Sequence, residues 1–222
     1  MIQRPTKSLS SKRTNHAFTL VEIMFVIVIL GIVGVGLTSL MIDSSRSMSW
    51  SINKSLITND FRQFTGSISK DALNASHAYL YPDLNSMTLS NRRAPGLSGD
   101  CLVLVSTEPW PAINEQRYYR KIVIYYRAAG GTPDRPVFRI ERDFPSATPT
   151  NPTTIDIETL LANQISNFTQ PETVLDLSRG LSGNQFFYRA TTEAFLINGE
   201  IIHGNNEQRV TNTYNLTIST RG

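Results

Sequence analysis

The hydrophobic pattern divides the chain into a polar start, one long apolar run and a mixed remainder. Residues 1–17 are polar and basic, whereas residues 18–42 are almost wholly apolar and carry a single charge, Glu22. The 20 residues from Ile23 to Ile42 contain no charge. About 20 helical residues, at a rise of about 1.5 Å each, span the roughly 30 Å hydrocarbon core of a bilayer. We therefore expect residues 18–42 to form a helix that crosses a membrane.

Apolar residues recur at helical spacing after this run. Successive members are three to five residues apart, and they are Met48, Ile52, Leu56, Phe61, Phe64, Ile68 and Ala72. This spacing predicts one apolar face on an amphipathic helix, which we place at residues 43–81 because no proline lies between Pro5 and Pro82. We expect the face to pack on a globular domain, although the seam of a coiled coil would show the same pattern.

The remainder, residues 82–222, has the pattern of a β-rich globular domain. Runs of β-branched and aromatic residues alternate with turn-forming stretches. The runs that we expect to be strands are residues 101–105, 117–127, 137–144, 185–190 and 209–219. The turn at residues 130–134 predicts an antiparallel hairpin, and residues 155–165 are expected to form a short helix. A long helix packed on an antiparallel sheet gives an α+β fold.

The positive charge of the chain is concentrated in residues 1–17. Lys and Arg number 21 and Asp and Glu 18, which gives an isoelectric point of about 9.1. Four of the bases lie in this leader, which has no acid, so the rest of the chain has 17 bases against 18 acids. That balance argues against nucleic acid as a partner. The bases of residues 117–127 are expected on the solvated face of a strand. The leader is expected in the cytoplasm, with the C-terminal bulk outside.

Residue types that carry chemistry are scattered along the chain. The three histidines, His16, His77 and His203, lie far apart and lack the spacing of metal ligands. The single cysteine, Cys101, can form no internal disulfide and is expected to be buried in an apolar strand. The sequences GLSGD and GLSGN do not match the G-x-S-x-G nucleophile elbow, and we expect both to be turns. We therefore expect no catalytic residue, no cofactor and no metal.

The junction between the leader and the apolar run has the sequence AFTLVE over residues 17–22. A short basic leader, this sequence and an apolar helix together resemble the class III signal of type IV prepilins and pseudopilins, over residues 12–42. The resemblance implies a pilin-like fold and a membrane-embedded prepilin peptidase that cuts between Ala17 and Phe18 and methylates the new amine of Phe18. The family typically has glycine before the cut. Because alanine is the next smallest residue, we expect Ala17 to permit cleavage at a lower rate.

Glu22 is the one charge within the apolar run, and such a charge is costly unless it has a partner. Glu22 lies four residues after Phe18, which is about one helical turn. In a fibre of staggered helices, its carboxylate can meet the cationic amine of Phe18 on a neighbouring subunit. Each charge neutralises the other, and their pairing would set the axial register. The resemblance therefore implies that Glu22 acts in assembly.

Three glycines, Gly31, Gly34 and Gly36, interrupt the apolar run. They would allow helices to approach closely, or would loosen the helix where it leaves the lipid, or would have no role. The sequence leaves these alternatives open.

The resemblance implies a non-catalytic filament subunit that is held in the bacterial inner membrane, with its C-terminal domain in the periplasm, and is then extracted into a filament. Its implied partners are the prepilin peptidase, other pilins, an inner-membrane assembly platform and membrane lipid. The large mature chain and the lack of a C-terminal cysteine pair favour a minor pilin, with most similarity to those of mannose-sensitive haemagglutinin (MSHA) pili. The alternatives are a minor pseudopilin of type II secretion and a periplasmic binding protein with an uncleaved anchor.

Overall fold

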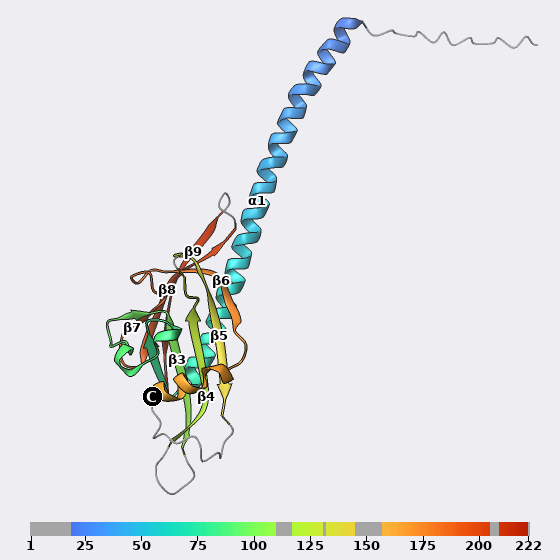
Figure 1. The fold of residues 1–222 in the computed structure, drawn as a ribbon. Helices are drawn as coiled ribbons and strands as arrows, with labels where there is room; N and C mark the ends of the chain where they lie inside the picture. The colour runs from blue at the N-terminus through green and yellow to red at the C-terminus, as the bar shows by residue number, and fades with distance from the viewer. Residues whose placement is uncertain (1–18, 110–116, 131, 145–156, 205–208, 222) are drawn as a thin grey trace, which may run out of the picture. The chain divides into compact units, whose positions relative to one another are not determined.

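Helix α1 (Leu20–Asn74) is the longest element of the computed structural model (Figure 1). The structure describes residues 19–109, 117–130, 132–144, 157–204 and 209–221. The chain forms two compact units, Met1–Ser49 and Trp50–Gly222, and α1 contributes residues to both. A long N-terminal helix followed by an antiparallel sheet confirms the expected α+β architecture.

Helix α1 ends at Asn74, before the end that the sequence predicted. Residues 77–81 form strand β1 (His77–Tyr81), which pairs antiparallel along its whole length with β3 (Cys101–Pro109). The backbone N–H of Ser76 also donates to the carbonyl of Val105 at 2.8 Å. Pairing with a long neighbouring strand therefore overrides the helical continuation that the absence of proline favoured. The amphipathic helix expected over residues 43–81 is wrong in its last residues.

The strands of the second unit form one antiparallel sheet. Its order is β1-β3-β4-β5-β6-β8-β7-β2, and β9 pairs with β8. The remaining strands are β2 (Ser98–Gly99), β4 (Arg117–Arg127), β5 (Arg135–Asp143), β6 (Glu172–Gly180), β7 (Phe187–Arg189), β8 (Ala194–His203) and β9 (Val210–Ser219). The predicted strands correspond to β3, β4, β5, β7 and β9, and β4 and β5 form the predicted hairpin. The sequence did not predict β1, β2, β6 or β8.

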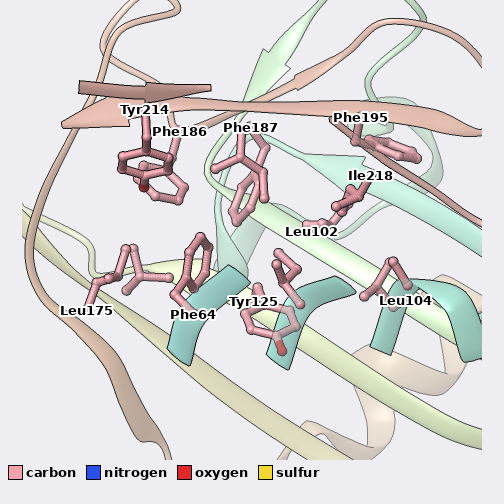
Figure 2. Close-up of a cluster of buried hydrophobic side chains, with 14 of the residues drawn as sticks. Phe64, Leu102, Leu104, Tyr125, Leu175, Phe186, Phe187, Phe195, Tyr214 and Ile218 are labelled. Atoms are coloured by element: carbon pink, nitrogen blue, oxygen red, sulfur yellow. The ribbon is translucent and has the colours of Figure 1, made fainter. Parts of the chain in front are cut away.

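The second part of α1 packs on one face of the sheet. Its buried members are Ile57, Phe64, Ile68 and Ala72. Phe64 meets the rings of Tyr125, Phe186 and Tyr214 edge to face, with centroid distances of 6.2, 5.9 and 6.4 Å (Figure 2). Such contacts contribute about 0.5–1.5 kcal/mol each beyond the burial of area. The expected packing of the apolar face on the domain is therefore confirmed for this part of the helix.

The first members of the predicted apolar face lie outside this core. Met48, Ile52 and Leu56 are 65, 49 and 44% exposed, and Ile57 takes the buried position instead. At about 100° per residue, Ile52 and Leu56 lie about 140° and 100° around the helix from Ile57. The five-residue step between Leu56 and Phe61 already departed from helical spacing. The apolar residues before Ile57 thus form a separate, exposed face.

Helix α2 (Ile157–Gln164) belongs to a second core, on the opposite face of the sheet. Alternation along β4 directs Ile122 and Ile124 into this core, where they join Leu160 and Leu161 of α2. The predicted helix over residues 155–165 is confirmed for its described part. The described residues of this unit also form three short 3-10 helices, Leu84–Ser86, Leu89–Asn91 and Ile165–Asn167.

A buried carboxylate fastens α2 to the sheet. Glu158 Oε1 accepts hydrogen bonds from Tyr81 Oη at 2.7 Å and from Arg92 Nε at 2.9 Å. Burial alone would raise the pKa of Glu158, but these two donors hold the pKa below its ordinary value. The same burial, together with the Glu158 carboxylate, raises the pKa of the Tyr81 phenol. Glu158 is therefore an ionised structural group.

An ion pair in the interior joins the two GLSG turns. Asp100 follows the first turn, residues 96–99, and Asn184 follows the second, residues 180–183. The Arg127 guanidinium lies 3.4 Å from the Asp100 carboxylate and donates from Nη2 to the carbonyl of Asn184 at 2.7 Å. The side chain of Arg127 has no exposed surface. One arginine at the end of β4 thus holds together two turns that are distant in sequence.

Asp100 is the acceptor on which this arrangement depends. It also accepts from Arg135 Nη2 at 3.1 Å and from the backbone N–H of Phe186 at 2.9 Å. Burial raises the pKa of Asp100 and lowers that of Arg127, against the attraction between the two charges. The expectation that the bases of β4 lie on a solvated face is therefore wrong for Arg127.

We predict that Asp100→Asn destabilises the second unit strongly. Removing one partner of a buried ion pair leaves the other charge uncompensated and typically costs about 3–5 kcal/mol. The measurement is urea unfolding of the full chain in detergent. Asp134→Asn is the matched control, because Asp134 also binds two arginines, Arg179 at 2.9 Å and Arg209 at 2.7 Å, but at the surface. Equal losses in the two variants would contradict a structural role for the buried pair.

Candidate processing and assembly site

The predicted cleavage site directly precedes helix α1. Ala17 and Phe18 lie outside the described residues, so their predicted cleavage and methylation stay predictions. The first helical residue is Leu20, two positions after Phe18. In the sequence, the bond between Ala17 and Phe18 therefore lies two residues before the first described helical residue.

Thr19 and Glu22 form a capping box at the start of α1. The backbone N–H and the hydroxyl of Thr19 donate to Glu22 Oε2 at 2.9 and 3.1 Å. The backbone N–H of Glu22 donates in return to Thr19 Oγ1 at 3.3 Å, and that of Ile23 donates to the carbonyl of Thr19 at 3.2 Å. This reciprocal pattern satisfies backbone donors that a helix start leaves free.

The capping box gives Glu22 a role within its own chain that we did not predict from the sequence. The family resemblance predicts only a pairing of this carboxylate with Phe18 of another subunit. The signal was present, because a threonine followed three residues later by glutamate, just before an apolar run, marks a helix start. A carboxylate at this end also complements the positive end of the helix dipole. Capping its own helix and pairing with a neighbouring subunit are distinct roles for Glu22, and variants can separate them.

The apolar part of α1 is exposed throughout. Its large apolar side chains between Leu20 and Ile42 are 47–78% exposed. Helix α1 is long and apolar enough to cross a membrane, and none of the residues in its most apolar window is buried. Since an exposed apolar surface of this extent is unfavourable in water, it requires lipid or other apolar helices as its surroundings.

The glycines of the apolar run leave α1 regular. The helix continues through Gly31, Gly34 and Gly36, and a Cβ atom on each would meet no neighbour within 4 Å. The Thr38 hydroxyl donates to the carbonyl of Gly34 at 2.9 Å, which keeps that polar group satisfied within the helix. Nothing within the described chain requires these glycines. Close packing against another helix, loosening of the helix where it leaves the lipid, and the lack of any role all stay open as alternatives.

The chemistry-bearing residues of the second unit have structural roles. Cys101 is fully buried beside Met87, and burial raises the pKa of its thiol, so the expected burial is confirmed. His203 Nε2 lies 2.7 Å from Asp60 Oδ2 and joins β8 to α1, while His77 lies in β1. Over the described ranges, no group of three or more His, Cys, Asp or Glu residues is placed to hold a metal ion.

A polar hollow beside α1 is lined by two charged side chains that pair with each other, Asp71 and Arg139. Asp71 Oδ2 accepts from Tyr125 Oη at 2.7 Å and from Arg139 Nε at 2.9 Å. Arg139 also pairs with Glu141, which in turn meets Lys121 of β4 at 2.8 Å. Arg139 and Lys121 are thus paired with acids rather than presented together to a phosphate backbone.

The comparisons with known proteins match the N-terminal segment. Residues 12–38 match the family model described as the prokaryotic N-terminal methylation motif. No curated protein and no solved structure matches the chain. The matched residues include Ala17, Phe18, Glu22 and the first part of helix α1, and an antiparallel sheet domain follows this helix. Motif and architecture together support a type IV pilin-like family, whose members are processed by a prepilin peptidase and assemble with other pilins.

Proposed function

We propose that the chain is a minor pilin, a non-catalytic structural subunit of a type IV pilus. The observation that carries the proposal is the methylation motif at the head of an apolar helix that the described part of the chain does not cover. Cleavage after Ala17 removes the basic leader, and methylation follows on Phe18. The helix first holds the subunit in the inner membrane, with the sheet domain in the periplasm. The assembly platform then moves the subunit into the filament.

Two features of the sequence favour a minor over a main subunit, and two sequence runs favour the MSHA type. The chain after Ala17 has 205 residues, which is large for a main pilin, and its single cysteine cannot form the C-terminal disulfide that many main pilins have. The runs at residues 42–76 and 99–105 resemble those of the larger MSHA minor pilins. A pseudopilin of type II secretion would carry the same N-terminal features. Neighbouring genes for pilus subunits or for a secretin-linked set separate the two functions.

Processing is tested on the membrane-resident chain. When the full chain is co-expressed with a prepilin peptidase, we expect intact mass analysis to give a protein that begins with methylated Phe18. Ala17→Gly should be processed faster, because glycine is the residue that the peptidase normally meets. Ala17→Leu is the control, and its bulk should retain the leader. A chain that still begins with Met1, or that is cut downstream of Phe18, would rule out the proposal.

The role of Glu22 in assembly is tested by separating its charge from its cap. Glu22→Gln keeps an acceptor that suits a capping box but removes the charge. We expect at least about tenfold less of this variant in sheared filaments, because an unpaired charge among apolar helices costs about 3 kcal/mol or more. Cleavage and methylation should be unchanged.

Thr19→Ala is the matched variant, since it weakens the cap and keeps the charge. We expect this variant to enter filaments at close to the normal level. The opposite pattern, with Glu22→Gln incorporated and Thr19→Ala excluded, would show that the cap and not the ion pair is what assembly needs.

A further inference from the structure

An aromatic ring and a cation form an exposed pair on α1, shortly after the apolar run. Trp50 is 53% exposed, and Lys54 Nζ lies 4.9 Å from the centroid of its ring. The two residues are four positions apart, so they occupy neighbouring turns of one helix face. The core of the second unit begins only at Ile57. Neither the processing site nor the domain core accounts for this pair.

The contact shows which way the two side chains lean. Side chains on an α-helix point toward its N-terminus and cover the preceding turn. Lys54 reaches back over Trp50, as this rule requires. The ammonium group therefore lies nearer than its own Cα atom to the apolar run, and the indole ring is expected to lean in the same direction.

The position along α1 matches the depth of the lipid headgroups. Trp50 follows Ile42 by eight residues, or about 12 Å of helix, and a lean of one turn brings the ring back by about 5 Å. The ring then lies about 7 Å beyond the end of the apolar run. Headgroup regions account for the difference between about 30 Å of hydrocarbon and about 40–45 Å of whole bilayer, which is about 5–8 Å on each side.

We propose that Trp50 and Lys54 anchor the membrane-resident subunit in the outer headgroup layer of the inner membrane. The indole lies at the level of the lipid headgroups, where tryptophan is enriched in membrane proteins, and the ammonium binds the lipid phosphates. The proposal rests on the membrane residence that the proposed function entails. It adds a specific site and a ligand class, the anionic phosphate of phospholipids.

The surroundings of the pair favour lipid over a second protein helix. Residues 43–54 contain five serines, and two bases stand against one acid, which suits a hydrated anionic layer. A protein helix that covered the Trp50 ring would have to displace or bury the Lys54 ammonium, and burying a charge without a partner is costly. Lipid phosphate supplies that partner directly.

The test measures the depth of Trp50 by fluorescence quenching. Trp110→Phe makes Trp50 the single tryptophan of the full chain, which is placed in vesicles of phosphatidylethanolamine and phosphatidylglycerol. We expect at least about twofold stronger quenching by lipids brominated near the headgroup end of the acyl chain than by lipids brominated near its terminus, as for an interfacial indole. The matched control adds Trp50→Phe and Leu73→Trp, because Leu73 is an exposed position of the same helix. The emission of this control variant should be quenched by neither of the two brominated lipids.

Lys54→Gln tests the cation, with Lys70→Gln as the control on the same helix. The quenching of Trp50 should rise with phosphatidylglycerol content in the parent and in Lys70→Gln, and lose this dependence in Lys54→Gln. Full quenching by aqueous iodide without lipid quenching would overturn the anchor. Shielding from both iodide and brominated lipid would overturn it too, since a protein partner would then cover the ring. Each readout is independent of Phe18 methylation, so failure of the anchor and failure of the filament function are distinguishable.

Discussion

The apolar surface of the first part of α1 is the constraint on which the rest depends. Its side chains from Leu20 to Ile42 find no cover within the described chain, so lipid or other helices must supply it. In either environment, this helix is the part of the chain that lipid or neighbouring helices contact. The capping box of Thr19 and Glu22 satisfies backbone donors at the start of this helix, close in sequence to the bond that the proposed peptidase cuts.

In contrast, the second part of α1 buries its apolar residues within its own chain. Its buried stripe forms one wall of a core, and the sheet provides the other wall through β3, β4 and β8. Because both faces of β4 are covered, the strand that bears Arg127 runs through the centre of the unit, and its ion pair with Asp100 fixes two turns at once. Among the described residues, ion pairs account for the buried charges of Asp100, Arg127 and Glu158.

The parts that the sequence predicted are those with strong local signals. Strand β4 is dense in aromatic and β-branched residues, and its bounds were predicted correctly, as was its hairpin with β5. Strand β8 was missed because Asn198 and Gly199 interrupt its pattern, and its place is set by pairing with β9 and β6. The end of α1 and the burial of Arg127 likewise depend on partners distant in sequence. At the processing site, the AFTLVE motif predicts the cut, and the spacing of Thr19 and Glu22 is the sequence signal of the cap.

The most direct test of the central claim is the mass of the subunit in filaments sheared from cells. The account predicts that the filament fraction contains a chain of residues 18–222 with one added methyl group on Phe18. Such a species requires cleavage, methylation and incorporation together. A subunit found only in the membrane fraction, with residues 1–17 still attached, would contradict the account.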